Sequence, residues 1–239
     1  MTNAEHDPDT ERYAYSPKAL ARLVLSHELR ELADAAAAGV PTGSDEYAEP
    51  GEEVAAALEL VRQAQQVVNR AVIYERAKGT SWEAIGEQMD IKRQSAHERY
   101  REIEQAWKDD LHTPFHPVPP GQDRSNYPRL HSAAYAPVNA GRSLDAWAQE
   151  RGQGEHAVTG GLPTLSLLDE MSQLLDGLKY LHRDMYKRPD PVARLRLTER
   201  KAALFDRIAI EEGRPEAAAQ AEEARALAAQ LRAEIEGTA

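Results

Sequence analysis

The stretch that most constrains this chain runs from residue 80 to residue 107 and has the sequence TSWEAIGEQMDIKRQSAHERYREIEQAW. Trp82, Ile85 and Met89 recur at i, i+3 and i+7, which predicts a short helix with one apolar face. Asp90 belongs to the few residue types other than glycine that enter the left-handed backbone region readily, so a sharp turn is expected there. The apolar residues of a second helix follow at steps of four, three and four: Ala96, Tyr100, Ile103 and Trp107.

Three single residues support the same prediction. The hydroxyl of Ser81 can accept a hydrogen bond from an unpaired N–H in the first turn of the first helix and so cap that helix. Gly86 occupies a position where a bulkier side chain would block the approach of the second helix. Ile91 supplies an apolar side chain directly after the turn. The sequence therefore predicts two helices packed closely across a tight turn.

The outward face of the predicted second helix is basic, although the chain as a whole is acidic. From Lys92 to Arg101 there are four basic residues and one acidic residue, Glu98, whereas the whole chain has a formal net charge of -11. Arginine and glutamine side chains can make paired hydrogen bonds to guanine and adenine in the major groove. The net acidity argues against nonspecific coating of nucleic acid, because phosphate neutralisation drives such binding. It allows a sequence-specific protein whose positive charge is confined to one helix.

In the pattern SW-x-x-IG…RQ-x-A-x-x-R, residues 80–107 resemble the helix-turn-helix DNA-binding motif that is common in regulators of high-GC bacteria. They are also similar to the last DNA-contacting region of sigma factors. Two positions depart from the usual pattern, because Asp90 stands where glycine is usual and Lys92 stands where serine or threonine often caps the second helix. The resemblance covers this module alone. The alternative is an ordinary helical hairpin whose charges are merely solvated.

The resemblance implies that the starts of both helices contact DNA. We expect Arg93 and Gln94 to contact base edges, and Glu98 to accept a hydrogen bond from a cytosine amino group or to repel wrong sequences. Hydroxyl and N–H groups at the start of the first helix are expected at phosphates. The full set of candidate DNA-binding residues is Thr80, Ser81, Lys92, Arg93, Gln94, Ser95, His97, Glu98 and Arg101.

The rest of the chain divides by composition, and the expected fold class is all-α. Six prolines between residues 111 and 140 make regular structure there unlikely on sequence grounds, while Ser143 to Arg151 predicts a short helix. Apolar seams at steps of four and three recur in the final third and predict an antiparallel helical bundle or coiled coil. The expected divisions are a disordered tail (1–15), a helical domain (16–110) that contains the helix-turn-helix (81–101), a proline-rich linker with a short helix (111–162), and the C-terminal bundle (163–239).

Two sequence features favour a homodimer. One is the set of seams in the final third, which can instead pack within one chain or bind another protein. The other is the first predicted helix, whose two adjacent apolar columns exceed what one neighbour needs. A two-fold pair would place two DNA-contacting helices about 34 Å apart, one turn of DNA. The residues of the two columns are Leu20, Val24, Leu25, Leu29 and Leu32.

No arrangement of residues supports catalysis, a cofactor or a metal ion. The chain has no cysteine, which excludes disulfides and thiolate sites. His112, His116 and His131 do not form a predicted metal site, because Pro114 breaks the helix between the first two and no carboxylate completes the set. The N-terminus is polar and acidic, unlike a signal peptide, and no apolar run approaches the ~20 residues of a membrane helix. We therefore expect a cytoplasmic, nucleoid-associated protein.

The resulting hypothesis is a sequence-specific DNA-binding protein, a transcriptional regulator or a plasmid or phage regulator, that contacts the major groove with helix 92–108. The alternative from another class is a protein-interaction module, in which the helical scaffold binds a protein such as a polymerase subunit and does not bind DNA. The net charge of -11 favours this alternative somewhat. An enzyme acting on DNA has no residues in its favour.

Overall fold

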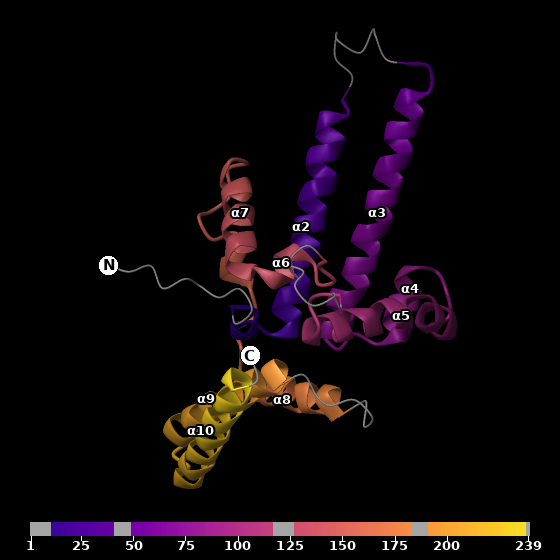
Figure 1. The fold of residues 1–239 in the computed structure, drawn as a ribbon. Coiled ribbons are helices and arrows are strands. Elements are labelled where there is room, and N and C mark those ends of the chain that lie inside the picture. The colour runs from indigo at the N-terminus through magenta and orange to yellow at the C-terminus, as the bar shows by residue number, and fades with distance from the viewer. Residues whose placement is uncertain (1–10, 41–48, 117–126, 183–190, 238–239) are drawn as a thin grey trace. The chain divides into compact units, whose positions relative to one another are not determined.

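The structure is a computed structural model in which the described chain is almost entirely helices and turns (Figure 1). The predicted all-α class is confirmed, and the only β-pairing in this described part is an isolated bridge between Phe115 and Pro128. The chain divides into two compact units, Met1–Thr164 and Leu165–Ala239. The described residues are 11–40, 49–116, 127–182 and 191–237.

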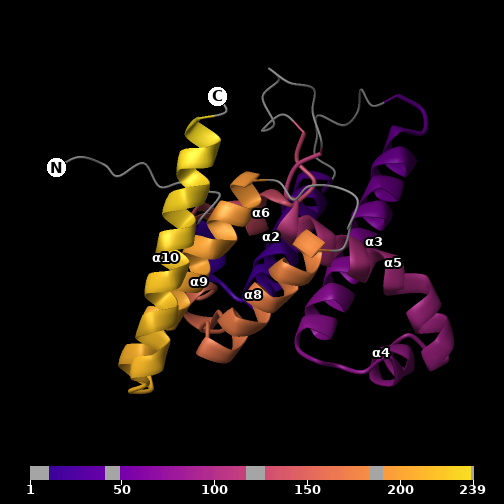
Figure 2. The same ribbon diagram turned by 60° about the horizontal axis from the view of Figure 1, so that its bottom comes forward.

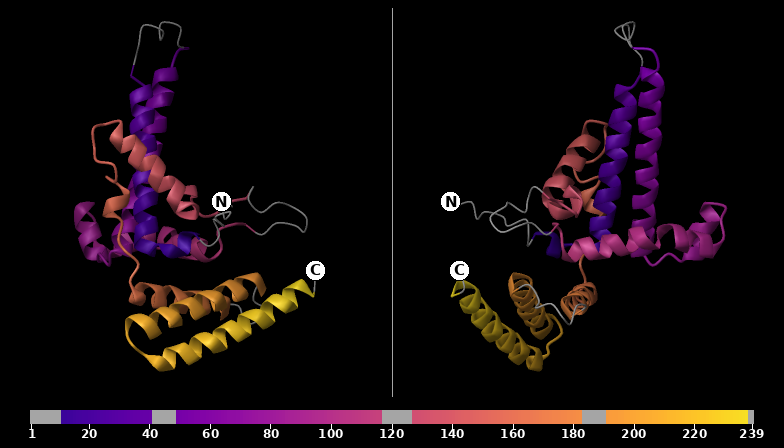
Figure 3. Two further views of the ribbon diagram at one scale, coloured as in Figure 1. Left: turned by 90° about the vertical axis from the view of Figure 1, so that its left-hand side faces the viewer. Right: turned by 45° about the vertical axis from the view of Figure 1, so that its right-hand side comes forward.

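Two long helices, α2 (Pro17–Ala38) and α3 (Glu52–Ala77), lie side by side and form the frame of the first unit (Figures 1 and 3). The Ser16 side chain caps the first turn of α2, and a proline occupies the next position, as the sequence predicts. The main core of this unit lies near the start of α2 and the end of α3. Its buried members are Leu20, Ala21, Val24, Ile73, Trp107, Leu130, Ala133 and Ala134.

A shorter pair of helices follows α3 at the same end of the hairpin. α4 (Trp82–Gln88) and α5 (Arg93–His112) lie at the lower end of the α2–α3 hairpin in Figure 1. Trp107, near the end of α5, is buried in the main core, so that α5 is anchored at one end and extends outward at the other. The expected positions of both helices agree with these bounds.

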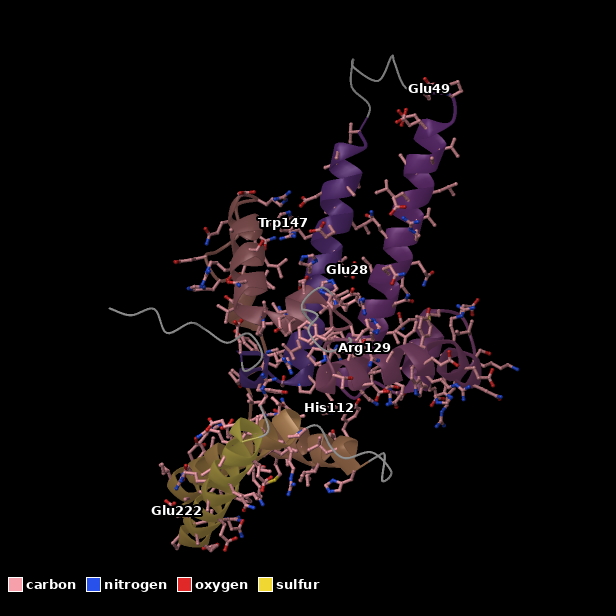
Figure 4. All side chains as sticks on the ribbon, viewed as in Figure 1. Glu28, Glu49, His112, Arg129, Trp147 and Glu222 are labelled. Atoms are coloured by element: carbon pink, nitrogen blue, oxygen red, sulfur yellow. The ribbon has the colours of Figure 1, made fainter. Side chains whose placement is uncertain are left out.

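The expected linker at 111–162 is wrong for the residues that the structure describes. α6 (Ser132–Tyr135) and α7 (Pro137–Gln149) both pack against α2, and α7 begins six residues before the predicted helix at 143–151. Pro137 does not break structure, because proline is tolerated at the first helical position. Trp147 of α7 points toward α2 and donates a 2.9 Å hydrogen bond from Nε1 to Asp34 (Figure 4).

The same contacts change the expectation for α2. Its second apolar side is covered largely by α6 and α7 of its own chain, which leaves less reason to assign that side to a second copy. Leu29 is the exception among the predicted column residues and remains about half exposed. The expected disordered tail is also too long, since Arg12–Ala14 forms a short 3-10 helix and Glu11 accepts a hydrogen bond from the N–H of Val138. Residues 1–10 lie outside the described residues.

The second unit consists of α8 (Leu167–His182), α9 (Pro191–Glu211) and α10 (Pro215–Glu236), and α9 packs against both of the others. Gly213 joins α9 to α10 with φ 65°, a left-handed conformation that glycine adopts without strain. α9 and α10 therefore form a helical hairpin, seen side by side in Figures 2 and 3. The core of this unit is Leu174, Leu197, Leu204, Ile208 and Ala217.

Some of the apolar seams predicted from the sequence are buried between the helices of the second unit, and others are exposed. Along α10 the small residues lie buried against α9 at the expected steps of four and three, because alanine lets two helices approach closely. Along α8, Leu174 is buried whereas Leu178 is exposed, and Met185 lies outside the described residues. No helix in the described ranges is long and apolar enough to cross a membrane. The buried residues of α10 are Ala217, Ala221, Ala224, Ala228 and Leu231.

Candidate nucleic-acid interface

The turn between α4 and α5 has the backbone conformation that the sequence predicts. Asp90 has φ 53°, the only positive φ of a non-glycine residue among the described residues. The carbonyl oxygen of Gly86 accepts hydrogen bonds from the N–H groups of Met89, at 3.0 Å, and Ile91, at 2.9 Å. A Cβ atom added at Gly86 would lie 2.6 Å from the carbonyl oxygen of Ile91. The left-handed conformation of Asp90 reverses the chain, and the hydrogen bonds to Gly86 hold the turn against the end of α4.

An apolar cluster beneath the two helices fixes which side of α5 points outward. Trp82 and Ile85 of α4 pack with Ala96 and Tyr100 of α5, and Val72 of α3 completes the cluster. The Ser81 hydroxyl accepts a 3.2 Å hydrogen bond from the N–H of Ala84, so the predicted cap forms. Burial of these side chains stabilises one rotation of α5 about its axis, because any other rotation would expose Tyr100 to water.

Arg76, at the end of α3, holds the start of α4 in place. Its guanidinium lies 4.6 Å from the ring centroid of Trp82, and its Nη1 donates a 2.5 Å hydrogen bond to the carbonyl oxygen of Thr80. Its Nε lies 3.5 Å from Oε1 of Glu104 on α5. Arg76 therefore touches all three helices. Sequence reasoning missed this role, and an arginine five residues before the N-cap residue Ser81 was the signal available.

Thr80 is engaged inside the protein, which separates it from the other candidate residues. Its hydroxyl donates a 2.5 Å hydrogen bond to Oε2 of Glu75. Hydrogen bonds from Lys78 and then from Thr80 lower the pKa of Glu75, which stays ionised as their acceptor. The Thr80 carbonyl oxygen is also occupied. In this conformation the hydroxyl hydrogen of Thr80 is directed at Glu75, so the expected contact with a phosphate stays a prediction that requires this hydrogen bond to break.

The remaining candidates on α5 are all exposed, and they cover the part of the helix surface that lies away from the buried Ala96 and Tyr100. Glu98 accepts a 2.9 Å hydrogen bond from Nε2 of Gln94, and His97 lies edge-on to Trp82 with ring centroids 5.6 Å apart. Arg99, which was not among the candidate residues, is exposed as well and borders the apolar side formed by Ala96 and Ile103. The name α5 ridge is used below for Lys92, Arg93, Gln94, Ser95, His97, Glu98, Arg99 and Arg101.

The start of α5 adds polar groups of its own to the ridge. Lys92 occupies the N-cap position and makes no side-chain hydrogen bond to the helix, as its sequence predicts. The first N–H groups of a helix have no partner within the helix and carry partial positive charge. Together with the guanidinium of Arg93, they can donate hydrogen bonds to an anion such as a phosphate. The ridge therefore combines donors for phosphate oxygens with an amide and a guanidinium that suit base edges.

The histidines considered as metal ligands have other surroundings. His131 caps α6, because its Nδ1 accepts a 3.1 Å hydrogen bond from the N–H of Ala133, and its Nε2 lies 3.4 Å from Oε1 of Glu28. Figure 4 shows Glu28 on α2, and Arg70 of α3 lies 3.4 Å from the same oxygen. The hydrogen bond from His131 and the charges of His131 and Arg70 lower the pKa of Glu28 despite its partial burial. Across the described ranges, no three such side chains are grouped as a metal would require.

Comparison with known proteins adds no relative from which a role could be transferred. No protein-family model matches the chain, and no curated protein and no solved structure matches it either. The geometry of the α5 ridge and the charge of its residues are therefore the basis for a functional assignment.

Proposed function

We propose that this chain is a sequence-specific DNA-binding protein, acting as a transcriptional regulator or as a plasmid or phage regulator, and that the first turns of α5 enter the major groove. One observation carries the proposal: the α5 ridge is cationic and exposed while the opposite side of the same helix is locked into an apolar cluster. The major groove of B-DNA admits an α-helix with its side chains. The helix-turn-helix arrangement of α4 and α5 supports this use.

The residues of the ridge divide into two roles. Arg93 and Gln94, in the first turn of α5, contact base edges, where arginine suits guanine and glutamine suits adenine. Lys92, Arg99 and Arg101 contact phosphates, which position the helix without selecting a sequence. The Ser81 hydroxyl already accepts a hydrogen bond from Ala84 but keeps its own hydrogen, so it can still donate one to a phosphate.

The net charge sets the expected salt dependence. With a formal charge of -11 on the chain, the positive potential is confined to the ridge, and long-range attraction to DNA is weak. Each phosphate that the ridge neutralises releases counterions, so affinity falls as the salt concentration rises. Specific binding is therefore expected to be strongest at low salt, and nonspecific binding is expected to be weak throughout.

The test is selection of bound sequences from a random DNA pool, followed by affinity measurements on the selected site by fluorescence anisotropy. Arg93→Ala is expected to cost about 1–3 kcal/mol, which corresponds to roughly a tenfold to hundredfold loss of affinity. Arg142→Ala is the matched control, because Arg142 is exposed on α7 in the same unit and lies outside the ridge. Equal affinities for the two variants would show that the ridge does not contact the site.

A second candidate function has support in the second unit. Leu168 of α8 and Ile210 of α9 are 80% and 81% exposed, which leaves apolar side chains of this unit available to a partner protein. A protein-interaction module without DNA binding would use this unit and leave the ridge solvated. The two functions are separated by random-sequence DNA at low salt, since the interaction module predicts no retardation of DNA at any protein concentration.

A further inference from the structure

The N-terminal half of α3 has an apolar stripe that remains exposed in the structure. Val54, Leu58, Val61 and Val68 are 64%, 63%, 66% and 38% exposed. They recur at steps of four, three and seven, so they lie on one side of the helix over four turns. α2 packs against a different side of α3, where Leu60 and the neighbouring Val67 are half-buried. The α2–α3 hairpin therefore leaves this stripe without a partner.

Toward the C-terminal end of α3, the same stripe continues into the apolar cluster that packs α3 against α4 and α5. Val72 lies one turn beyond Val68 and is buried in the cluster with Trp82 and Tyr100. The stripe is thus one continuous apolar surface whose lower end is covered by α4 and α5. Its upper end is built from the same residue types, and contiguous exposed apolar surface on a soluble helix marks an interaction site.

The exposed part of the stripe is large enough for the apolar centre of a protein interface. From their exposed fractions, the four side chains together present roughly 300 Å² of apolar surface. A standard interface buries ~800 Å² per partner and is a little over half apolar. A contact along this stripe would therefore supply the larger share of the apolar area of an interface, with the flanking residues supplying the rest.

We propose that α3 pairs antiparallel with α3 of a second copy of this chain, with Val61 at the two-fold axis. A two-fold interface requires a patch that is complementary to itself. Apolar residues are symmetric about Val61 at steps of four, three, three and four, through Val54, Leu58, Ala64 and Val68. In the pair, Val61 faces Val61, Leu58 faces the small Ala64, and Val54 faces Val68.

Polar residues on the helix favour the antiparallel over the parallel arrangement. α3 begins with Glu52 and Glu53, and parallel pairing would bring these carboxylates of both copies together. Like charges placed opposite one another disfavour an interface. Antiparallel pairing separates the two acidic ends and sets each at the level of Asn69. It also places Gln65 opposite the small Ala57, where parallel pairing would oppose two glutamines.

This inference goes beyond DNA binding and does not depend on it, because the stripe shares no residue with the α5 ridge. A second copy would add to the proposed function by giving DNA two ridges at once. A chain that dimerises and does not bind DNA would leave this inference intact and remove the proposed function. A chain that binds DNA as a monomer would leave the proposed function intact and remove this inference.

The natural absence of cysteine makes the pairing and its register directly testable in the full chain. Single variants Val54→Cys, Val61→Cys and Val68→Cys are treated with a short bis-maleimide crosslinker. Val61→Cys is expected to form covalent dimers by itself. Val54→Cys and Val68→Cys are each expected to give no covalent dimer alone, because the two cysteines of the pair then lie far apart, and to crosslink only when the two variants are mixed. Efficient crosslinking of every variant with itself would indicate parallel pairing and overturn the proposal.

The oligomeric state gives an independent measurement by analytical ultracentrifugation. The unmodified chain is expected to sediment as a dimer, and Val61→Glu is expected to weaken dimerisation at least tenfold. Gln66→Glu is the matched control, because it adds the same charge to an exposed residue on another side of α3. Val61 is two-thirds exposed, so its replacement leaves the fold intact, which tryptophan fluorescence verifies. A monomeric unmodified chain would overturn the proposal.

Discussion

Replacing Gly86 by alanine tests whether α4 and α5 approach as closely as the structure has them. The new Cβ atom would lie 2.6 Å from the carbonyl oxygen of Ile91 and 3.4 Å from the backbone nitrogen of Arg93. The first contact is far inside van der Waals distance, and both neighbours are backbone atoms. Backbone cannot move aside here without breaking the 2.9 Å hydrogen bond from the Ile91 N–H to Gly86.

The expected magnitude combines two opposing effects. Overpacking costs ~1–3 kcal/mol, and a Cβ atom 2.6 Å from a backbone oxygen belongs in the upper part of that range, at ~2–3 kcal/mol. Alanine in a helix regains about 1 kcal/mol over glycine through its higher helix propensity. Gly86→Ala is therefore expected to lower the free energy of unfolding of the first unit by roughly 1–2 kcal/mol, which corresponds to a fall in Tm of about 2–8 °C for a unit of this size.

Tryptophan fluorescence during thermal unfolding is the assay, because Trp82, Trp107 and Trp147 all belong to the first unit. The control is Gly154→Ala, since no atom lies within 4 Å of a Cβ at Gly154 and the same reduction in unfolded-chain entropy applies. Gly154→Ala is expected to leave Tm unchanged or to raise it slightly. An equal or higher Tm for Gly86→Ala would refute the close backbone approach at the turn.

Two further predictions concern buried polar groups of the first unit. Burial first, and then the positive charges near His131 and Arg30, lower the pKa of His27 below its usual 6.5. The unfolded chain then binds more protons than the folded one below pH 6.5, so stability rises with pH across that window. Tm is expected to increase between pH 5.5 and pH 7.5, about one unit on either side of the ordinary histidine pKa. His27→Gln should remove most of this increase. A pH-independent Tm in the unmodified chain would contradict the prediction. Burial raises the pKa of Asp145, but hydrogen bonds from Thr159 and from the N–H groups of Val158 and Thr159 outweigh it and lower the pKa overall. Asp145→Ala leaves these donors without their acceptor and is expected to cost roughly 1–3 kcal/mol, measured by urea unfolding; a cost within error of that of an exposed control such as Asp176→Ala would mean that water replaces the carboxylate.

The tight turn between α4 and α5 was predictable from the sequence because its determinants are local. The cap at Ser81, the left-handed Asp90 and the close approach at Gly86 lie within ten residues of one another. The side of α5 that faces outward follows from the same short stretch. Its apolar residues recur with the helical period, and burying them leaves Arg93 and its neighbours in water.

The wrong expectations concern contacts between residues that are distant in sequence. Proline frequency predicted a linker, yet α6 and α7 pack on α2 through contacts with residues about a hundred positions earlier, such as the hydrogen bond from Trp147 to Asp34. Composition describes local backbone preference and does not report which surface a segment covers. The ion pair of Arg76 with Glu104 on α5 was missed for the same reason. The hydrogen bond from Thr80 to Glu75 spans only five residues and was missed although it is local.

The sequence by itself determined the helices, their caps and the cationic face of α5, since these depend on periodicity and on the conformational preferences of single residues. Only the tertiary structure decided which apolar surfaces are covered. It assigned the second side of α2 to α6 and α7 and left the stripe of α3 in solvent, although both helices show similar apolar columns. The physical reason is that burial is a property of the assembled chain. A valine contributes to stability only where another surface excludes water from it.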